Sequence, residues 1–128
     1  MTAIQNLSAP LGRLLLSLIF VVSGVGKIGA YAGTQAYMDS MGVPGVLLPL
    51  VIALEILGGL AIIVGWQARI AAFLLAGFCL LSAVLFHGNI GDQGEQIQFL
   101  KNLGLAGGFL LIVAHGAGAW SLDNRRSA

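Results

Sequence analysis

Four long apolar runs constrain what this chain can fold into more than any other feature of its sequence. They lie near residues 10–30, 44–66, 69–87 and 99–119. Each run is long enough to cross roughly 30 Å of hydrocarbon as a helix, and each contains few charged residues. The sequence therefore predicts an all-α membrane protein, a four-transmembrane-helix antiparallel bundle that forms a single domain over residues 1–128.

The composition excludes an ordinary soluble protein. Hydrophobic residues make up 58% of the chain and charged residues only 9%, which is too few to cover a water-exposed surface. The formal net charge of +1 provides no basic field for nucleic acid, so we expect no nucleic-acid partner. The partner that this composition requires is the lipid bilayer.

The first apolar run has an alternative interpretation as a secretory signal. Residues 14–25 resemble an apolar signal core, and residues 30–32 have the small-x-small form of a cleavage site. However, Lys27 separates the apolar core from that site, and no basic cluster precedes Arg13. We therefore expect this segment to be retained as a membrane span.

The basic residues predict the orientation of the bundle. Four spans place both termini on one side of the membrane. That side carries Arg13, Arg69, Arg125 and Arg126, and the opposite side carries Lys27 and Lys101. Because the positive-inside rule assigns the side richer in basic residues to the cytoplasm, we expect both termini to be cytoplasmic.

Ionisable residues at membrane depth are the strongest functional signal, because each is costly unless it is paired, hydrated or turned inward. Glu55 lies near the middle of the second apolar run. Lys27 lies near the far end of the first run, and its side chain leans back along its helix towards the level of Glu55. We expect the two to pair inside the bundle as candidate catalytic residues. The alternative is an ion pair that only fixes how the helices pack.

Further candidates for ligand binding are spread along the chain. Arg13 shares a helical face with Lys27, although its side chain could instead reach lipid headgroups. Lys101 and Asn102 open the fourth apolar run. They precede Gly104 and Gly108, whose spacing predicts a close contact between helices.

His87 ends the third apolar run and is also a candidate ligand-binding residue. The loop after it supplies Asn89, Asp92 and Glu95, so a metal site is an alternative. We expect no metal, because no second histidine or cysteine pair has ligand spacing. The single cysteine, Cys79, has apolar neighbours and is interpreted as a core residue.

The arrangement of these residues resembles the DoxX family of small bacterial membrane proteins. The resemblance rests on Arg13, Phe20, Gly24 and Lys27 in the first run, Glu55, Gly58, Gly59 and Gly65 in the second, and Phe99, Leu100, Lys101, Asn102, Gly107 and Gly108 in the fourth. It implies a four-helix protein of the bacterial inner membrane. Some relatives are membrane subunits of thiosulfate:quinone oxidoreductase or partners in thiol and oxidative-stress systems, so a redox-enzyme partner is expected.

The leading hypothesis is therefore a non-autonomous membrane subunit or accessory of a quinone- or thiol-linked oxidoreductase system. Glu55, Lys27, Lys101 and Asn102 would line a polar pocket for a quinone headgroup or a similar ligand. One alternative is a transport element for protons or a small solute, through the bundle or through a homo-oligomer. Another is a non-catalytic assembly or docking protein.

Overall fold

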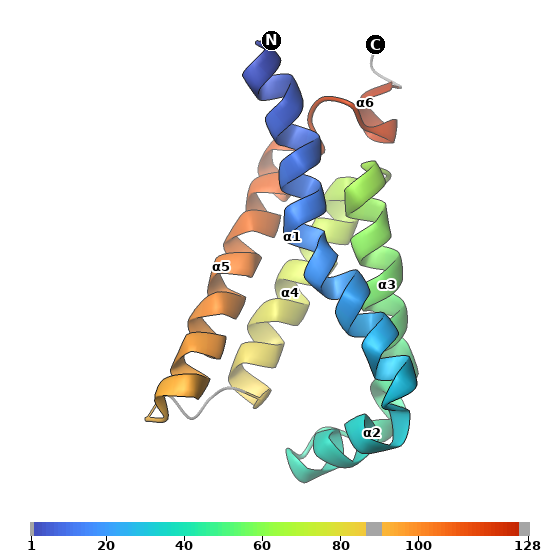
Figure 1. The fold of residues 1–128 in the computed structure, drawn as a ribbon, viewed down its shortest axis with the longest axis vertical. Coiled ribbons are helices and arrows are strands. Elements are labelled where there is room, and N and C mark those ends of the chain that lie inside the picture. The colour runs from blue at the N-terminus through green and yellow to red at the C-terminus, as the bar shows by residue number, and fades with distance from the viewer. Residues whose placement is uncertain (1, 87–90, 126–128) are drawn as a thin grey trace.

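The computed structural model describes residues 2–86 and 91–125 of the chain. Within these residues the chain is helical, with no strand. The elements are α1 (Ala3–Gly29), α2 (Tyr31–Ser40), the 3-10 helix η1 (Gly45–Leu47), α3 (Leu48–Val64), α4 (Ala68–Phe86), α5 (Gln93–His115) and α6 (Leu122–Arg125) (Figure 1). The predicted all-α class is confirmed.

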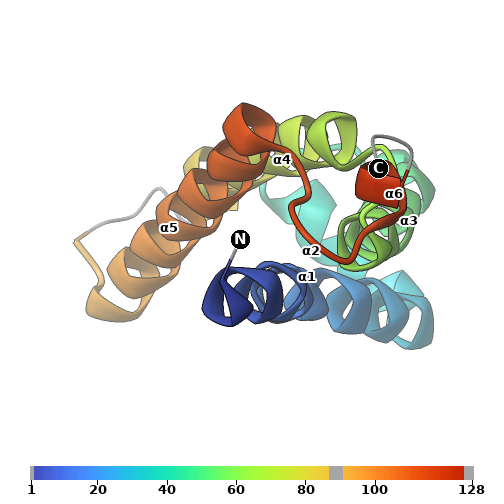
Figure 2. The same cartoon turned by 90° about the horizontal axis from the view of Figure 1, so that it is seen from above.

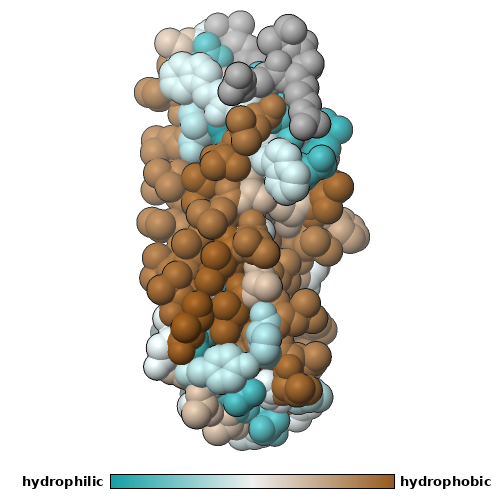
Figure 3. All heavy atoms as spheres, turned by 90° about the vertical axis from the view of Figure 1, so that its right-hand side faces the viewer, coloured by the Kyte–Doolittle hydropathy of each residue, from teal (hydrophilic) through white to brown (hydrophobic). Residues whose placement is uncertain are grey.

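Four helical segments of the described chain are long and apolar enough to cross a membrane, which confirms the predicted membrane protein. They are α1, η1 with α3, α4 and α5. On the face shown in Figure 3, apolar side chains form a continuous band around the middle, and polar side chains gather at both ends. This distribution matches a protein whose middle is covered by hydrocarbon.

α1 begins at Ala3, earlier than the predicted start near residue 10, because a capping box precedes it. The hydroxyl of Thr2 accepts a hydrogen bond from the backbone N–H of Gln5 at 3.2 Å. The side chain of Gln5 accepts one from the N–H of Thr2 at 3.0 Å. The helix therefore starts with satisfied amides and continues through Pro10, whose missing N–H removes one helical hydrogen bond.

Between the first two apolar runs, residues 31–43 contain Gly33, Asp39 and Gly42 and are followed by Pro44, a pattern that predicts a loop. The structure instead has the short helix α2 there. Thr34 Oγ1 donates to the carbonyl of Ala30 at 2.8 Å, and Ser40 Oγ donates to the carbonyl of Tyr37 at 2.6 Å. These hydroxyl groups therefore form hydrogen bonds with the backbone of α2 itself. α2 ends before Gly42, which adopts a left-handed conformation with φ 81°.

The membrane helices form two pairs. α1 packs along α3 and α4 packs along α5, and α3 contacts α4 less extensively. The two pairs converge at the end of the molecule that holds both termini and diverge towards the end that holds α2 (Figures 1 and 2). We call these the terminal end and the α2 end. The divergence leaves space between the pairs near α2.

A tight turn and the C-terminal segment close the terminal end. α3 ends at Gly65 in a left-handed conformation, with φ 74°. The carboxylate of Asp123 accepts hydrogen bonds from the backbone N–H groups of Gln67 and Ala68, both at 2.8 Å. Asp123 also donates its own N–H to the carbonyl of Gly65 at 2.8 Å. Asp123, in the first turn of α6, therefore caps the start of α4.

Small residues and two aromatic rings form the core. The buried face of α4 consists of Ala68, Ala71, Ala72, Leu75, Ala76, Cys79 and Ala83. The rings of Phe20 on α1 and Phe109 on α5 meet edge to face, with centroids 5.3 Å apart. Cys79 lies in this core as predicted.

The predicted glycine contact on α5 is wrong for Gly104. Among the described residues, nothing beyond the backbone of its own helix lies within 4 Å of where a Cβ at Gly104 would stand. α5 instead buries its Ala106 and Phe109 face, which leaves Gly104 on the outer surface. α1 and α3 do approach each other closely at glycines. A Cβ at Gly24 would lie 2.6 Å from Ile56, and one at Gly59 would lie 2.8 Å from Val21.

These positions provide a matched pair of substitutions. We expect Gly59→Leu to lower the free energy of unfolding by at least about 2 kcal/mol, because the new side chain forces α1 away from α3. Gly104→Leu gains the same helix propensity but meets no other helix, so it should not lower the free energy of unfolding. Unfolding of purified protein in detergent micelles measures both. Equal stability of the two variants would contradict the close contact.

Candidate functional site

Lys27 and Glu55 form an ion pair between α1 and α3, as predicted. Lys27 Nζ lies 2.8 Å from Glu55 Oε1 and donates a hydrogen bond to Ser23 Oγ at 2.6 Å. The Glu55 side chain is only 3% exposed, whereas that of Lys27 is 27% exposed. The carboxylate is therefore enclosed by protein, and the ammonium group retains an accessible side.

The close packing of α1 on α3 brings these two charges together. Gly24 lies one turn before Lys27, and a Cβ at this position would stand 3.3 Å from the Cβ of Glu55. The absence of a side chain at Gly24 lets α3 approach α1 at this level. Ser23, also one turn before Lys27, supplies the hydroxyl that holds the ammonium group.

The ion pair lines a cavity of about 540 Å³ between the two helix pairs. Lys101 and Asn102 line the same cavity from α5. The structure thus brings together four residues that the sequence singled out, from three helices that are distant along the chain. The rest of the lining is mostly apolar and comes from α1, α2, α3, α4 and α5.

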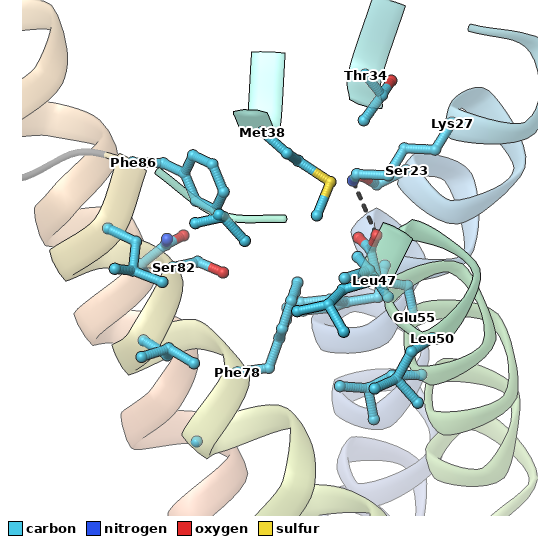
Figure 4. Close-up of a pocket in the computed structure, with 18 of the residues that line it drawn as sticks. Ser23, Lys27, Thr34, Met38, Leu47, Leu50, Glu55, Phe78, Ser82 and Phe86 are labelled. Carbon is cyan, nitrogen blue, oxygen red and sulfur yellow. Dashed lines mark hydrogen bonds and ion pairs between the residues drawn. The ribbon is translucent and has the colours of Figure 1, made fainter. Parts of the chain in front are cut away.

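α4 supplies an aromatic wall that the sequence interpretation missed. Phe78, Ser82 and Phe86 face the ion pair across the cavity (Figure 4). These residues recur every four positions, so they share one helical face. That spacing could have identified the wall, because Ser82 is a polar residue on an otherwise apolar stripe.

α2 covers the cavity at the α2 end of the molecule. The ring of Tyr37 stacks on Phe86 of α4, with centroids 5.6 Å apart and planes 22° from parallel. Met38 is buried, and its side chain extends towards the Lys27–Glu55 pair (Figure 4). Thr34 also lines the cavity. The segment predicted as a loop therefore contributes directly to the candidate site.

Arg13 lies at the terminal end, far along α1 from the cavity, and does not line it. Its guanidinium is buried and donates to main-chain carbonyls. Nη1 donates to Ile63 at 2.9 Å, and Nη2 donates to Ala119 at 2.9 Å and to Trp120 at 2.8 Å. Arg13 therefore neither reaches lipid headgroups nor faces the pocket, because its two terminal nitrogens donate to the last turn of α3 and to the C-terminal segment.

The metal alternative depended on residues of the loop between α4 and α5. His87 and Asn89 lie outside the described residues. Asp92 acts as the N-cap of α5, accepting a hydrogen bond from the N–H of Gly94 at 2.9 Å. Within residues 2–86 and 91–125, no three His, Cys, Asp or Glu side chains are grouped to hold a metal ion.

The chemistry of the cavity is that of a small polar centre inside an apolar chamber. Lys27, Lys101 and Asn102 offer hydrogen-bond donors, and Glu55 offers an acceptor. The aromatic rings of α4 offer flat surfaces for stacking. Such a chamber suits a ring that carries oxygen atoms.

Comparisons with known proteins agree with this architecture. Residues 9–88 match the sequence profile of the family described as DoxX. The chain is 48% identical over 123 residues to "Inner membrane protein YqjF" of Escherichia coli (strain K12), covering 96% of this chain and 95% of that protein. It is 35% identical over 122 residues to "Inner membrane protein YphA" of the same organism, covering 90% and 87%.

A more distant similarity extends to "Putative oxidoreductase CatD" of Bacillus subtilis (strain 168). The identity is 32% over 85 residues, which cover 63% of each chain. No solved structure matches the chain.

A double-mutant cycle measures the coupling of the ion pair. We expect Glu55→Gln or Lys27→Met alone to lower the free energy of unfolding by about 2–3 kcal/mol, because each leaves its partner without a counter-charge. The cost lies below that of a fully buried pair because Lys27 is 27% exposed. The double variant should lose less than the sum of the two. Additive losses in detergent unfolding experiments would show that the charges do not interact.

Proposed function

This chain belongs to the DoxX family, and we propose that it is the membrane component of an oxidoreductase system that binds a quinone headgroup, or a similar carbonyl-bearing ring, in the cavity beside Glu55. It is an integral protein of the bacterial inner membrane with several membrane-spanning helices. The observation that carries the proposal is the convergence of Lys27, Glu55, Lys101 and Asn102 on one cavity at membrane depth.

The size and lining of the cavity fit such a ligand. Its volume of about 540 Å³ lies within the range of about 300–1,000 Å³ that is typical of small-molecule sites. Its surface is mainly apolar, with a few polar groups that can fix the orientation of a ring. The name of the Bacillus subtilis relative, which describes an oxidoreductase, supports the same chemical class.

In this proposal each polar residue has a distinct role. Lys101 and Asn102 donate hydrogen bonds to the oxygen atoms of the ring. Glu55 exchanges a proton with the ligand, and Lys27 stabilises the carboxylate while it is charged. Phe78 and Phe86 hold the plane of the ring. A partner redox enzyme supplies or accepts the electrons, because the chain contains one cysteine and therefore no cysteine pair of its own.

The packing supports ligand binding over transport. A pathway for protons or solutes must continue from the cavity to the terminal end. Phe20, which lines the cavity, meets the fully buried Phe109 edge to face between α1 and α5, on the side towards the terminal end. This contact favours a chamber closed at that end rather than a channel.

Quinone binding tests the proposal directly. Protein purified with its native lipids should contain quinone, and titration with a ubiquinone should saturate. Asn102→Leu should weaken binding about tenfold through the loss of one hydrogen bond. Asn6→Leu, a control on α1 away from the cavity, should leave binding unchanged. A preparation with no quinone and no binding in titration would contradict the proposal.

We also propose that the terminal end faces the cytoplasm. Arg69 lies at the start of α4 there, and Arg13 lies in the half of α1 nearer that end. Lys27 and Lys101 lie towards the α2 end. Reporter fusions at Gly91 and at Ala128 should give opposite results, with the reporter at Ala128 active only as a cytoplasmic domain. A periplasmic signal from Ala128 would reverse the orientation.

A further inference from the structure

We infer that the cavity receives its ligand sideways from the bilayer, through an opening between α3 and α4, and that the ligand is a lipid-soluble molecule with a long apolar tail. The inference rests on the proposed function and adds the route of entry and the class of ligand. It also identifies Gly77 as the residue that sets the width of the opening.

The first observation is how α3 and α4 separate. Near the terminal end they touch, since a Cβ at Gly58 on α3 would stand 3.4 Å from Leu75 on α4. Towards the α2 end the two helices diverge (Figure 1). Leu50 on α3 and Leu81 on α4 both line the cavity there and are 67% and 58% exposed. The cavity surface therefore continues onto the surface that lipid covers.

The second observation is the distribution of polar groups. Ser23 and Lys27 approach the cavity from α1, and Lys101 and Asn102 approach it from α5. The lining from α3 and α4 contains Glu55 and Ser82, but its exposed residues are apolar. These are Leu47 and Leu50 before and within α3, and Leu74, Leu81 and Leu85 on α4. A bound molecule would place its polar group inwards and its apolar part outwards between α3 and α4.

The third observation is that α2 is fixed across the α2 end of the cavity. The Gln35 side chain donates a hydrogen bond to the carbonyl of Gly45 at 3.1 Å, and the Asp39 carboxylate accepts one from the N–H of Gly45 at 2.7 Å. The stacked rings of Tyr37 and Phe86 join α2 to α4. These contacts narrow the route from the aqueous side, so the bilayer is the favoured source of the ligand.

Gly77 lies on the α4 side of this opening. It lines the cavity and is exposed. In the part of the chain that the structure describes, nothing beyond the backbone of its own helix lies within 4 Å of where its Cβ would stand. Glycine weakens a helix interior, and no neighbouring element here requires the absence of a side chain. Gly77 therefore leaves space in the opening, at a point that the apolar tail of the ligand would have to pass.

Substitution of Gly77 tests the inference. Wild type, Gly77→Ala, Gly77→Leu and the control Gly107→Leu would be reconstituted in phosphatidylcholine vesicles. Gly107 on α5 is also exposed with open space around it but does not line the cavity. Two probes would be titrated: a ubiquinone with a long isoprenoid tail, and tail-free 2,3-dimethoxy-5-methyl-1,4-benzoquinone. Thermal unfolding should show all four proteins equally folded, since neither glycine packs against another element.

We expect Gly77→Leu to weaken binding of the tailed quinone by at least about tenfold, because leucine overfills the opening. Gly77→Ala should have an intermediate effect. The tail-free quinone should bind equally to all four proteins, and Gly107→Leu should behave as wild type with both probes.

The outcomes separate the two proposals. Unchanged binding of the tailed quinone to Gly77→Leu would overturn the lateral opening and leave the binding site intact. An equal loss for both quinones would mean that the leucine fills the site itself, which would overturn the role of the tail. Failure of wild type to bind either quinone would overturn the proposed function instead.

Discussion

The guanidinium of Arg13 holds together three segments on which the rest of the architecture depends. It joins α1 to the last carbonyls of α3 and to the carbonyls of Ala119 and Trp120. The last carbonyls of a helix have no partner within that helix, and this side chain satisfies those at the end of α3. Because the helices are fastened at this end, the two pairs can separate at the other end without loss of the fold. The cavity is the result of that separation.

The ion pair and the glycines of the α1–α3 contact act together. A carboxyl group at the depth of Glu55 is tolerated only with a partner, and the partner has to come from a neighbouring helix. Gly24 permits the approach that places Lys27 within 2.8 Å of the carboxylate. The pair is not sealed in the core, however, since Lys27 remains partly exposed to the cavity. A purely structural pair could be fully enclosed, whereas this pair can contact a bound molecule.

The sequence predicted the spans, the pairing of Glu55 with Lys27, and the four polar residues that share the cavity. Prediction from the sequence failed where a membrane helix gives no periodic pattern of hydropathy. Lipid-facing and core-facing residues are equally apolar, so hydropathy could not show that Gly104 faces outwards. The partners of Arg13 are main-chain carbonyls, which have no signature in residue type. α2 was missed because its glycine and polar residues resemble a loop, although its hydroxyl groups bond within the helix.

The cap that Asp123 provides has a consequence for biosynthesis. The start of α4 is closed by a side chain 55 residues later in the chain. During translation α3, α4 and α5 leave the ribosome before that carboxylate does, so α4 enters the membrane with its first amides bonded only to water or headgroups. Closure of the terminal end is therefore a late event in assembly. A nascent chain stalled before residue 123 would contain all four spans but would lack the hydrogen bonds of Asp123 that join the start of α4 to the end of α3.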